Sequence, residues 1–240
     1  MLSRKNWRVE LVILFALPLC GLVLLGLVSQ FAGKASAPAA APMKFSEVIL
    51  NTLMFQGVIL TGLWFFLRAH QTGVRQAFGF GQGSPGRAML WGAGVAVVVL
   101  PVGYGLQVLG VRLLEHLGWP AQPQTSVEWL INGAWWQRAY LAFFAVVLAP
   151  LAEEGVFRGI FFVFLRDLGF PRLAFWGTGI FFGLIHLNAA AFVPLTLFGL
   201  ALAWLYQRTG NLLSCITAHA LFNLAPFVML AFGINFEGGR

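Results

Sequence analysis

The second half of this chain carries residues that can move protons or donate hydrogen bonds, inside segments that are otherwise apolar. Two adjacent glutamates, Glu153 and Glu154, come first, and His186, His219 and Asn223 follow. A carboxylate in hydrocarbon is energetically expensive, so such residues are rare in apolar segments and usually face a partner or a water-filled cavity. The default interpretation of this set is therefore a functional site.

Together these residues supply what hydrolysis by water needs. A carboxylate such as Glu153 can take a proton from water, and a histidine such as His186 can help to orient that water. A second histidine, His219, and the amide of Asn223 can donate hydrogen bonds to an oxyanion. Alternatively, Glu153, His186 and His219 could bind a metal as one carboxylate and two imidazoles, the ligand set of many catalytic zinc sites. The sequence fits both schemes.

Each residue also has a purely structural interpretation. Glu154 and Arg158 are four residues apart with the acid on the N-terminal side, which is the geometry of an ion pair along one helix. Glu153 points about 100° away from Glu154 and is free to face another helix. A single histidine or asparagine within a membrane is often a hydrogen-bond partner between helices. These interpretations work one residue at a time but do not explain why several such residues share one depth.

The apolar segments that position these residues indicate membrane-spanning helices. Of the 240 residues, 59% are hydrophobic and 10% are charged, which is too apolar for a soluble domain of this length. The predicted fold class is all-α, a polytopic transmembrane helix bundle of about seven spans that forms one membrane domain over 1–240. The predicted spans are 11–31, 48–67, 88–109, 139–166, 173–191, 194–206 and 212–232. An interfacial loop with a short amphipathic helix is predicted over 110–137.

The first span has a second interpretation, as a cleaved signal peptide. It follows three basic residues and precedes an Ala-Ser-Ala sequence at 35–37. Its length of about 20 residues exceeds the roughly 7–15 apolar residues of a signal peptide, which favours a retained helix.

Residue counts place three candidate residues at one depth. Counted from the basic residue at the inner end of each span, Glu153, His186 and His219 lie 13, 14 and 11 residues along the chain. At about 1.5 Å per helical residue, these positions fall at nearly the same level, near the middle of the bilayer. They belong to three different predicted helices, so the three side chains can converge.

The basic residues lie between the apolar segments and not along one solvated face. The net charge of +7 therefore favours attraction to lipid headgroups and control of topology over binding of nucleic acid. With the N-terminus inside, the inner segments hold nine arginines and lysines and the outer segments hold five. This bias predicts a cytoplasmic N-terminus and an outer C-terminus. Nothing in the sequence sets the oligomeric state.

Three motifs run through the same residues. Glu-Glu-x-x-x-Arg occupies 153–158, Phe-x-x-x-His occupies 182–186, and His-x-x-x-Asn occupies 219–223. In this order, each on a predicted membrane helix, they resemble the CAAX protease and bacteriocin-processing family. This family is also called the Abi family of intramembrane proteases and is related to the Ras-converting endopeptidase. The resemblance covers about the last third of the chain.

The resemblance implies an all-helical membrane endopeptidase whose catalytic core is about 139–232. It implies that Glu153 activates the water with His186, and that His219 and Asn223 stabilise the oxyanion. Supporting roles at the site, or in holding the substrate, fall to Glu154 and Arg158. The implied mechanism uses the glutamate and no cofactor, with zinc as the alternative. The implied substrate is a membrane peptide or protein, such as a prenylated CAAX-like or bacteriocin-type peptide. The implied location is a bacterial inner membrane.

Two other classes of function fit parts of the pattern. A non-catalytic membrane scaffold would use the polar residues to hold helices together, although the intact set of motif residues counts against it. A proton-coupled transporter could relay protons through buried Glu and His. Such transporters carry broken helices at corresponding positions of two repeated halves, and no repeat is evident. The absence of G-x-S-x-G and H-E-x-x-H argues against a serine or zincin-type protease.

Overall fold

A computed structural model describes residues 7–32, 44–119 and 125–233, and within these ranges every regular element is a helix. The predicted all-α class is confirmed. The central part of the chain contains two π-helical stretches, η2 and η3, between α-helices. The elements in chain order are α1 (Val9–Ala32), α2 (Phe45–Ala69), α3 (Val74–Ala77), α4 (Pro85–His116), α5 (Thr125–Asn132), α6 (Trp135–Phe143), η2 (Phe144–Leu148), α7 (Ala149–Glu154), η3 (Gly155–Phe162), α8 (Val163–Asp167), α9 (Pro171–Ile185), α10 (Phe192–Thr209) and α11 (Leu212–Ala231).

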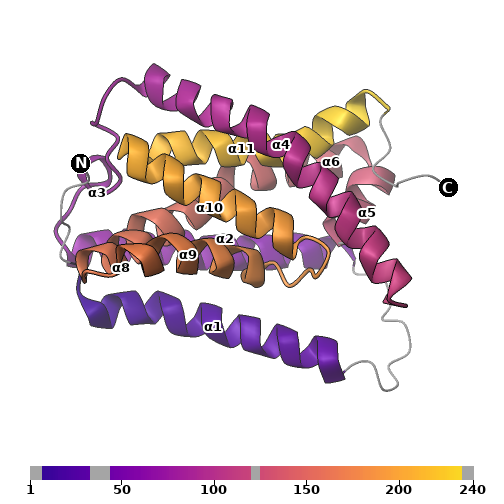
Figure 1. The fold of residues 1–240 in the computed structure, drawn as a ribbon, viewed down its shortest axis with the longest axis horizontal. Coiled ribbons are helices and arrows are strands. Elements are labelled where there is room, and N and C mark those ends of the chain that lie inside the picture. The colour runs from indigo at the N-terminus through magenta and orange to yellow at the C-terminus, as the bar shows by residue number, and fades with distance from the viewer. Residues whose placement is uncertain (1–6, 33–43, 120–124, 234–240) are drawn as a thin grey trace.

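The segment from α6 to α8 lies at the centre of the bundle. Helices α2, α9, α10 and α11 all pack against parts of it. Half of its apolar window is buried inside the protein, a larger share than in any other long apolar helix of the described ranges. Helix α1 lies along one side of the bundle, and α4 crosses the other side over α10 and α11 (Figure 1). The central segment carries both glutamates, so the fold surrounds them with helices.

Local sequence signals set the helix ends that bring α11 back to this segment. Gly210 ends α10 in the left-handed conformation, with φ of 63°, which glycine adopts without strain. Asn211 then caps α11, because its Oδ1 accepts a hydrogen bond from the backbone N–H of Leu213 at 3.0 Å. The resulting tight turn makes α10 and α11 neighbours, and α11 also packs on α7 and η2.

Five helical segments are long and apolar enough to cross a membrane: α1, α2, α4, the combined segment Trp135–Asp167, and α11. The prediction of about seven spans is not confirmed. The other two predicted spans, 173–191 and 194–206, correspond to α9 and α10. Helix α9 has 15 residues, or about 22 Å, against a hydrocarbon core of about 30 Å. Helix α10 has 18 residues but ends in polar Gln207-Arg208-Thr209, which lowers its mean hydropathy.

Two predicted segments differ in detail from the structure. The span 139–166 is helical throughout, but η2 and η3 interrupt the α-helix. Pro150, which has no backbone N–H to donate within a helix, is the second residue after η2. The interfacial region predicted over 110–137 begins later, because α4 continues to His116. Its expected short helix is α5, and residues 120–124 lie outside the described ranges.

The first predicted span forms α1, a helix of 24 residues. Most of the features behind the signal-peptide interpretation, Arg4, Lys5 and residues 35–37, lie outside the described residues. Retention of this helix therefore stays a prediction.

Candidate active site

Glu154 and Arg158 form an ion pair in the interior of the bundle. Nη1 of Arg158 donates to Oε1 of Glu154 at 2.9 Å, and both side chains are fully buried. Nη2 of the same guanidinium donates to the backbone carbonyl of Gly199 on α10 at 2.8 Å. The ion pair predicted from the spacing of four residues is confirmed. It also ties the central segment to α10.

His219, on α11, lies between the two glutamates. Its Nδ1 is 2.9 Å from Oε1 of Glu154, and its Nε2 is 3.9 Å from Oε2 of Glu153. An ionised carboxylate only accepts hydrogen bonds, so Nδ1 carries the hydrogen in the bond to Glu154. The opposite nitrogen of the ring therefore faces Glu153. The structure thus places His219 beside Glu153 without a direct hydrogen bond, and it gives Glu154 a second partner that the sequence did not predict.

Glu153 is the glutamate whose carboxylate is available for chemistry. Its Oε2 is buried yet has no hydrogen-bond partner within the protein. The 3.9 Å to His219 is too long for a direct hydrogen bond, and it is a separation that one water molecule can bridge. A buried acceptor without a partner is costly, so native proteins keep such groups mainly where they have a function. Oε2 of Glu154 also lacks a partner, but Oε1 of Glu154 already accepts two hydrogen bonds.

His186 lies at the end of α9 and not within a span, so the predicted helix over 173–191 is wrong beyond Ile185. The chain leaves the helix at Leu187, whose φ is 50°. Nearby, the Oδ1 of Asn188 accepts a hydrogen bond from the N–H of Ala191, just before α10. This local bond gives the backbone an alternative to continuing α9.

Nδ1 of His186 lies 2.7 Å from the backbone carbonyl of Phe182. Because a carbonyl only accepts, Nδ1 donates in this bond, and Nε2 of the neutral ring keeps a lone pair. That lone pair can accept a hydrogen bond from water. Among the described residues, no hydrogen bond or ion pair joins His186 to Glu153, so the structure does not bring together the whole predicted set by direct contact.

The ring of Phe182 connects the parts of the site. Its centroid lies 4.9 Å from the ring of His186 and 5.5 Å from the ring of His219. The guanidinium carbon of Arg158 lies 4.9 Å from the same centroid, within the range of a cation–π contact. The motif Phe-x-x-x-His contains Phe182, but sequence reasoning gave it no role. Its spacing of four residues from His186 is the signal that both side chains share one face of α9.

Asn223 holds the central segment in place. Its Nδ2 donates to the carbonyl of Ala145 in η2 at 2.8 Å, which uses one of the two amide hydrogens. In η3, the carbonyl of Gly159 accepts a hydrogen bond from Nε1 of Trp7 at 3.0 Å. Each π-helical stretch thus has a carbonyl that bonds to the side chain of a distant residue. Short π-helical stretches within α-helices are frequent at functional sites, and these two flank the glutamates.

The predicted metal ligands do not form a metal-binding group. No cluster of three or more His, Cys, Asp or Glu side chains that could hold a metal ion occurs in the described part of the chain. Nδ1 of His186 and Nδ1 of His219 both bond to the protein itself. These bonds leave Nε2 of each ring free, as in histidines that bind a metal through one nitrogen and donate from the other. The choice between the zinc scheme and the glutamate scheme therefore stays a prediction.

Residues 134–225 match the family model described as type II CAAX prenyl endopeptidase Rce1-like. Residues 134–225 are therefore similar to this family, and we call them the Rce1-like segment. The Rce1-like segment contains both glutamates, Arg158, both histidines and Asn223. The resemblance inferred from the three motifs is therefore confirmed for the part of the chain that carries them.

The Rce1-like segment begins at the N-terminal end of α6 and ends within α11. Among curated proteins, the chain is similar to the UPF0177 protein YaiF of Lactococcus lactis subsp. lactis (strain IL1403). The two are 34% identical over 109 residues, which cover 44% of this chain and 46% of YaiF. The chain thus spans about half the length of the curated relative it matches. No solved structure matches the chain.

Proposed function

We propose that this chain is an intramembrane endopeptidase that hydrolyses a peptide bond with a water molecule activated by Glu153. The observation that carries the proposal is the position of His219. Its Nδ1 is held by Glu154, and its Nε2 lies 3.9 Å from a Glu153 oxygen that has no partner in the protein. The match to the Rce1-like endopeptidase family supports hydrolysis of a peptide bond.

In the proposed reaction, the water donates one hydrogen bond to Glu153 and one to Nε2 of His186. Glu153 takes a proton from the water while the water oxygen attacks the carbonyl carbon of the peptide bond. The electron pair of the C=O bond moves to the oxygen and forms an oxyanion. The proton then passes from Glu153 to the amide nitrogen, the C–N bond breaks, and the amine leaves.

The oxyanion requires donors, and His219 and Asn223 supply them in this proposal. Nε2 of His219 donates when the ring carries both hydrogens, and the negative charge of Glu154 stabilises that imidazolium. The charges of Glu153, Glu154, Arg158 and His219 then sum to zero inside the bundle. Asn223 contributes the amide hydrogen that does not bond to Ala145. Glu154 and Arg158 act as positioning residues for His219.

The proposed route uses the glutamate and no metal, and its support is that no group of three potential metal ligands occurs in the described part of the chain. The proposed substrate is a membrane-associated peptide or protein, since the site is enclosed by apolar helices. A prenylated CAAX-like tail or a bacteriocin-type peptide fits this description. Nucleic acid is not a proposed partner.

We place the chain in the inner membrane of a bacterium, with α9 and α10 as the sixth and seventh helices at membrane depth. Their support is their position in the bundle, where α9 packs on η3 and α10 packs on α4 and α9. The excess of basic residues in the inner segments supports a cytoplasmic N-terminus.

The proposal is tested with purified protein in lipid nanodiscs and a fluorogenic prenylated peptide that ends in a CAAX-type sequence. The Glu153→Gln variant keeps the size of the side chain but removes the base, so cleavage should fall by about 10²–10⁴-fold. The matched control is Glu115→Gln, an exposed glutamate on α4, which should cleave like wild type. Cleavage by Glu153→Gln at the wild-type rate would show that the mechanism is wrong. Unfolding of both Glu153→Ala and His219→Ala, without cleavage by wild type, would favour a scaffold.

A further inference from the structure

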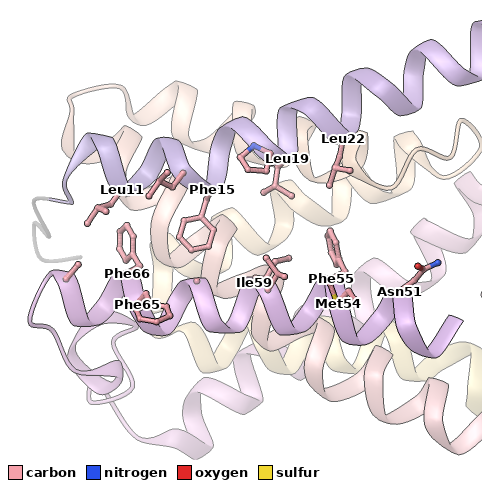
Figure 2. A pocket seen from close by; sticks show the side chains of 15 residues that line it. Leu11, Phe15, Leu19, Leu22, Asn51, Met54, Phe55, Ile59, Phe65 and Phe66 are labelled. Atoms are coloured by element: carbon pink, nitrogen blue, oxygen red, sulfur yellow. The ribbon is translucent and has the colours of Figure 1, made fainter. Parts of the chain in front are cut away.

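An apolar groove of about 850 Å³ lies between α1 and α2, and it does not include any residue of the glutamate site. Figure 2 shows side chains of the two helices pointing toward each other across it. Its walls are formed mainly by leucines and a phenylalanine of α1 and by phenylalanines, Met54 and Ile59 of α2. The groove is therefore a concave site separate from the glutamates.

The groove forms because α1 and α2 contact each other at one end, whereas the rest of each helix packs on different elements of the bundle. At the joined end, the backbone N–H of Arg8 donates to Nε2 of His70 at 2.8 Å. The ring of Trp7 also packs edge-on against Phe66, with centroids 5.1 Å apart. Beyond this end, α1 packs on α9 and η3, whereas α2 packs on α7 and η3. Phe15 of α1 packs edge-on against Phe66 of α2 at the floor of the groove, with centroids 5.9 Å apart, whereas Leu14, Met54 and Val58 stay exposed.

A shallower depression of about 440 Å³ lies beside the groove on α2. The two depressions share four residues as a common wall: Met54, Val58, Gly62 and Phe65. These residues follow one another at spacings of four, four and three, so they form one stripe along the helix. Two apolar depressions therefore lie side by side on α2, and a lipid with two hydrocarbon chains has this shape.

One end of the shared wall carries a cation. Arg68 follows Phe65 by three residues, in the last turn of α2, and its side chain is exposed. Its guanidinium carbon lies 5.2 Å from the centroid of the Trp64 ring. Within the described ranges, Arg68 forms no ion pair with a carboxylate. A guanidinium beside a tryptophan at the end of an apolar helix is suited to the phosphate level of a membrane.

Helix α1, the other wall of the groove, has a second arginine, Arg8, at the end that lies near Arg68. Arg8 precedes Leu11, the first groove residue of α1, by three residues. The bond between Arg8 and His70 brings this end of α1 to the end of α2 that carries Arg68. Glu10 pairs with Arg8 at 2.8 Å and offsets its charge. Arg68 is therefore the principal cation at the groove.

We propose that the groove between α1 and α2 binds one anionic glycerophospholipid. Its phosphate contacts Arg68, with Arg8 beside it, and its two acyl chains occupy the two depressions. Charge complementarity selects this occupant over a second copy of the chain or a transmembrane segment of another protein. The site is separate from the glutamates, so the proposal does not depend on the proposed function.

The headgroup is tested by native mass spectrometry of the full chain, titrated with phosphatidylglycerol or phosphatidylcholine. Wild type should retain one phosphatidylglycerol in preference to phosphatidylcholine. Arg68→Gln should weaken phosphatidylglycerol binding about fivefold, the effect of one basic residue at an anionic surface. The matched control, Arg112→Gln, changes an exposed arginine of α4 outside the groove and should bind like wild type. Equal retention of both lipids by wild type would overturn the proposal, as would equal losses in the two variants.

Binding of the acyl chains is tested by placing a bulky side chain on the shared wall, where it blocks the two depressions. Val58→Trp projects a large ring into both depressions and should abolish lipid retention. Val98→Trp on α4 is the matched control, since both valines are 65% exposed. Thermal unfolding in detergent verifies that both variants fold. Unchanged lipid retention in Val58→Trp would overturn the proposal. A wild-type dimer that Val58→Trp dissociates would also overturn it, because it would assign the groove to a second copy.

Discussion

Replacing Arg158 with methionine should strongly destabilise the protein, because it leaves a buried carboxylate without its cation. Arg158 and Glu154 are fully buried, and the guanidinium donates both to Glu154 and to the Gly199 carbonyl. Removing one partner of a buried ion pair costs about 3–5 kcal/mol. The bond to Gly199 is lost as well, and the total is a large fraction of the roughly 5–15 kcal/mol that stabilises a domain.

The double variant Glu154→Gln/Arg158→Met separates the structural role of this pair from its role at the site. Removing both charges is often nearly neutral for stability, so the double variant should recover most of what Arg158→Met loses. It should not recover cleavage, because His219 loses the carboxylate that holds Nδ1. Stability without activity is the outcome expected if Glu154 positions His219.

Unfolding of wild type, both single variants and the double variant in mild detergent is followed by tryptophan fluorescence, and cleavage is measured on the same samples. The exposed pair of Arg8 and Glu10 serves as the control in an equivalent double-mutant cycle. Its coupling free energy of unfolding should be too small to measure. The reasoning is refuted if Arg158→Met is as stable as wild type. Recovery of cleavage by the double variant would refute the positioning role of Glu154.

Three further predictions concern the frame around the site. Asn223→Leu removes the bond to Ala145 and leaves a carbonyl unsatisfied, so the free energy of unfolding should fall by about 1–3 kcal/mol. Thermal unfolding together with the cleavage assay checks this, and no change in either would contradict it. Gly183→Ala would place a Cβ against Oγ1 of Thr196 and 2.9 Å from the backbone oxygen of Phe192, so α9 and α10 must separate, at a cost of about 1–3 kcal/mol. Gly94→Ala, where the Cβ meets nothing within 4 Å, is its control. Treatment with a chelator should leave cleavage unchanged, and a loss restored by added zinc would contradict the glutamate route.

The helical class and the Glu154–Arg158 pair could be predicted from sequence because both depend on neighbours along the chain. Apolar runs predict helices, and a spacing of four residues places two side chains on one face. The number of spans could not be predicted in this way. The run 173–191 is mostly apolar, but α9 stops at Ile185, where the chain turns toward α10. A hydropathy pattern cannot locate a turn that lies inside an apolar run.

The sequence by itself determined which residues form the candidate site, since their types and motif spacing single them out. Only the tertiary structure decided how they pair. His219 bonds to Glu154, 65 residues away, and faces Glu153, because α11 packs on α7. The same holds for the π-helical stretches beside the glutamates, where Asn223 and Trp7 bond to carbonyls 78 and 152 residues away. Periodicity fixes the face on which a side chain lies, whereas packing between helices fixes what that face meets.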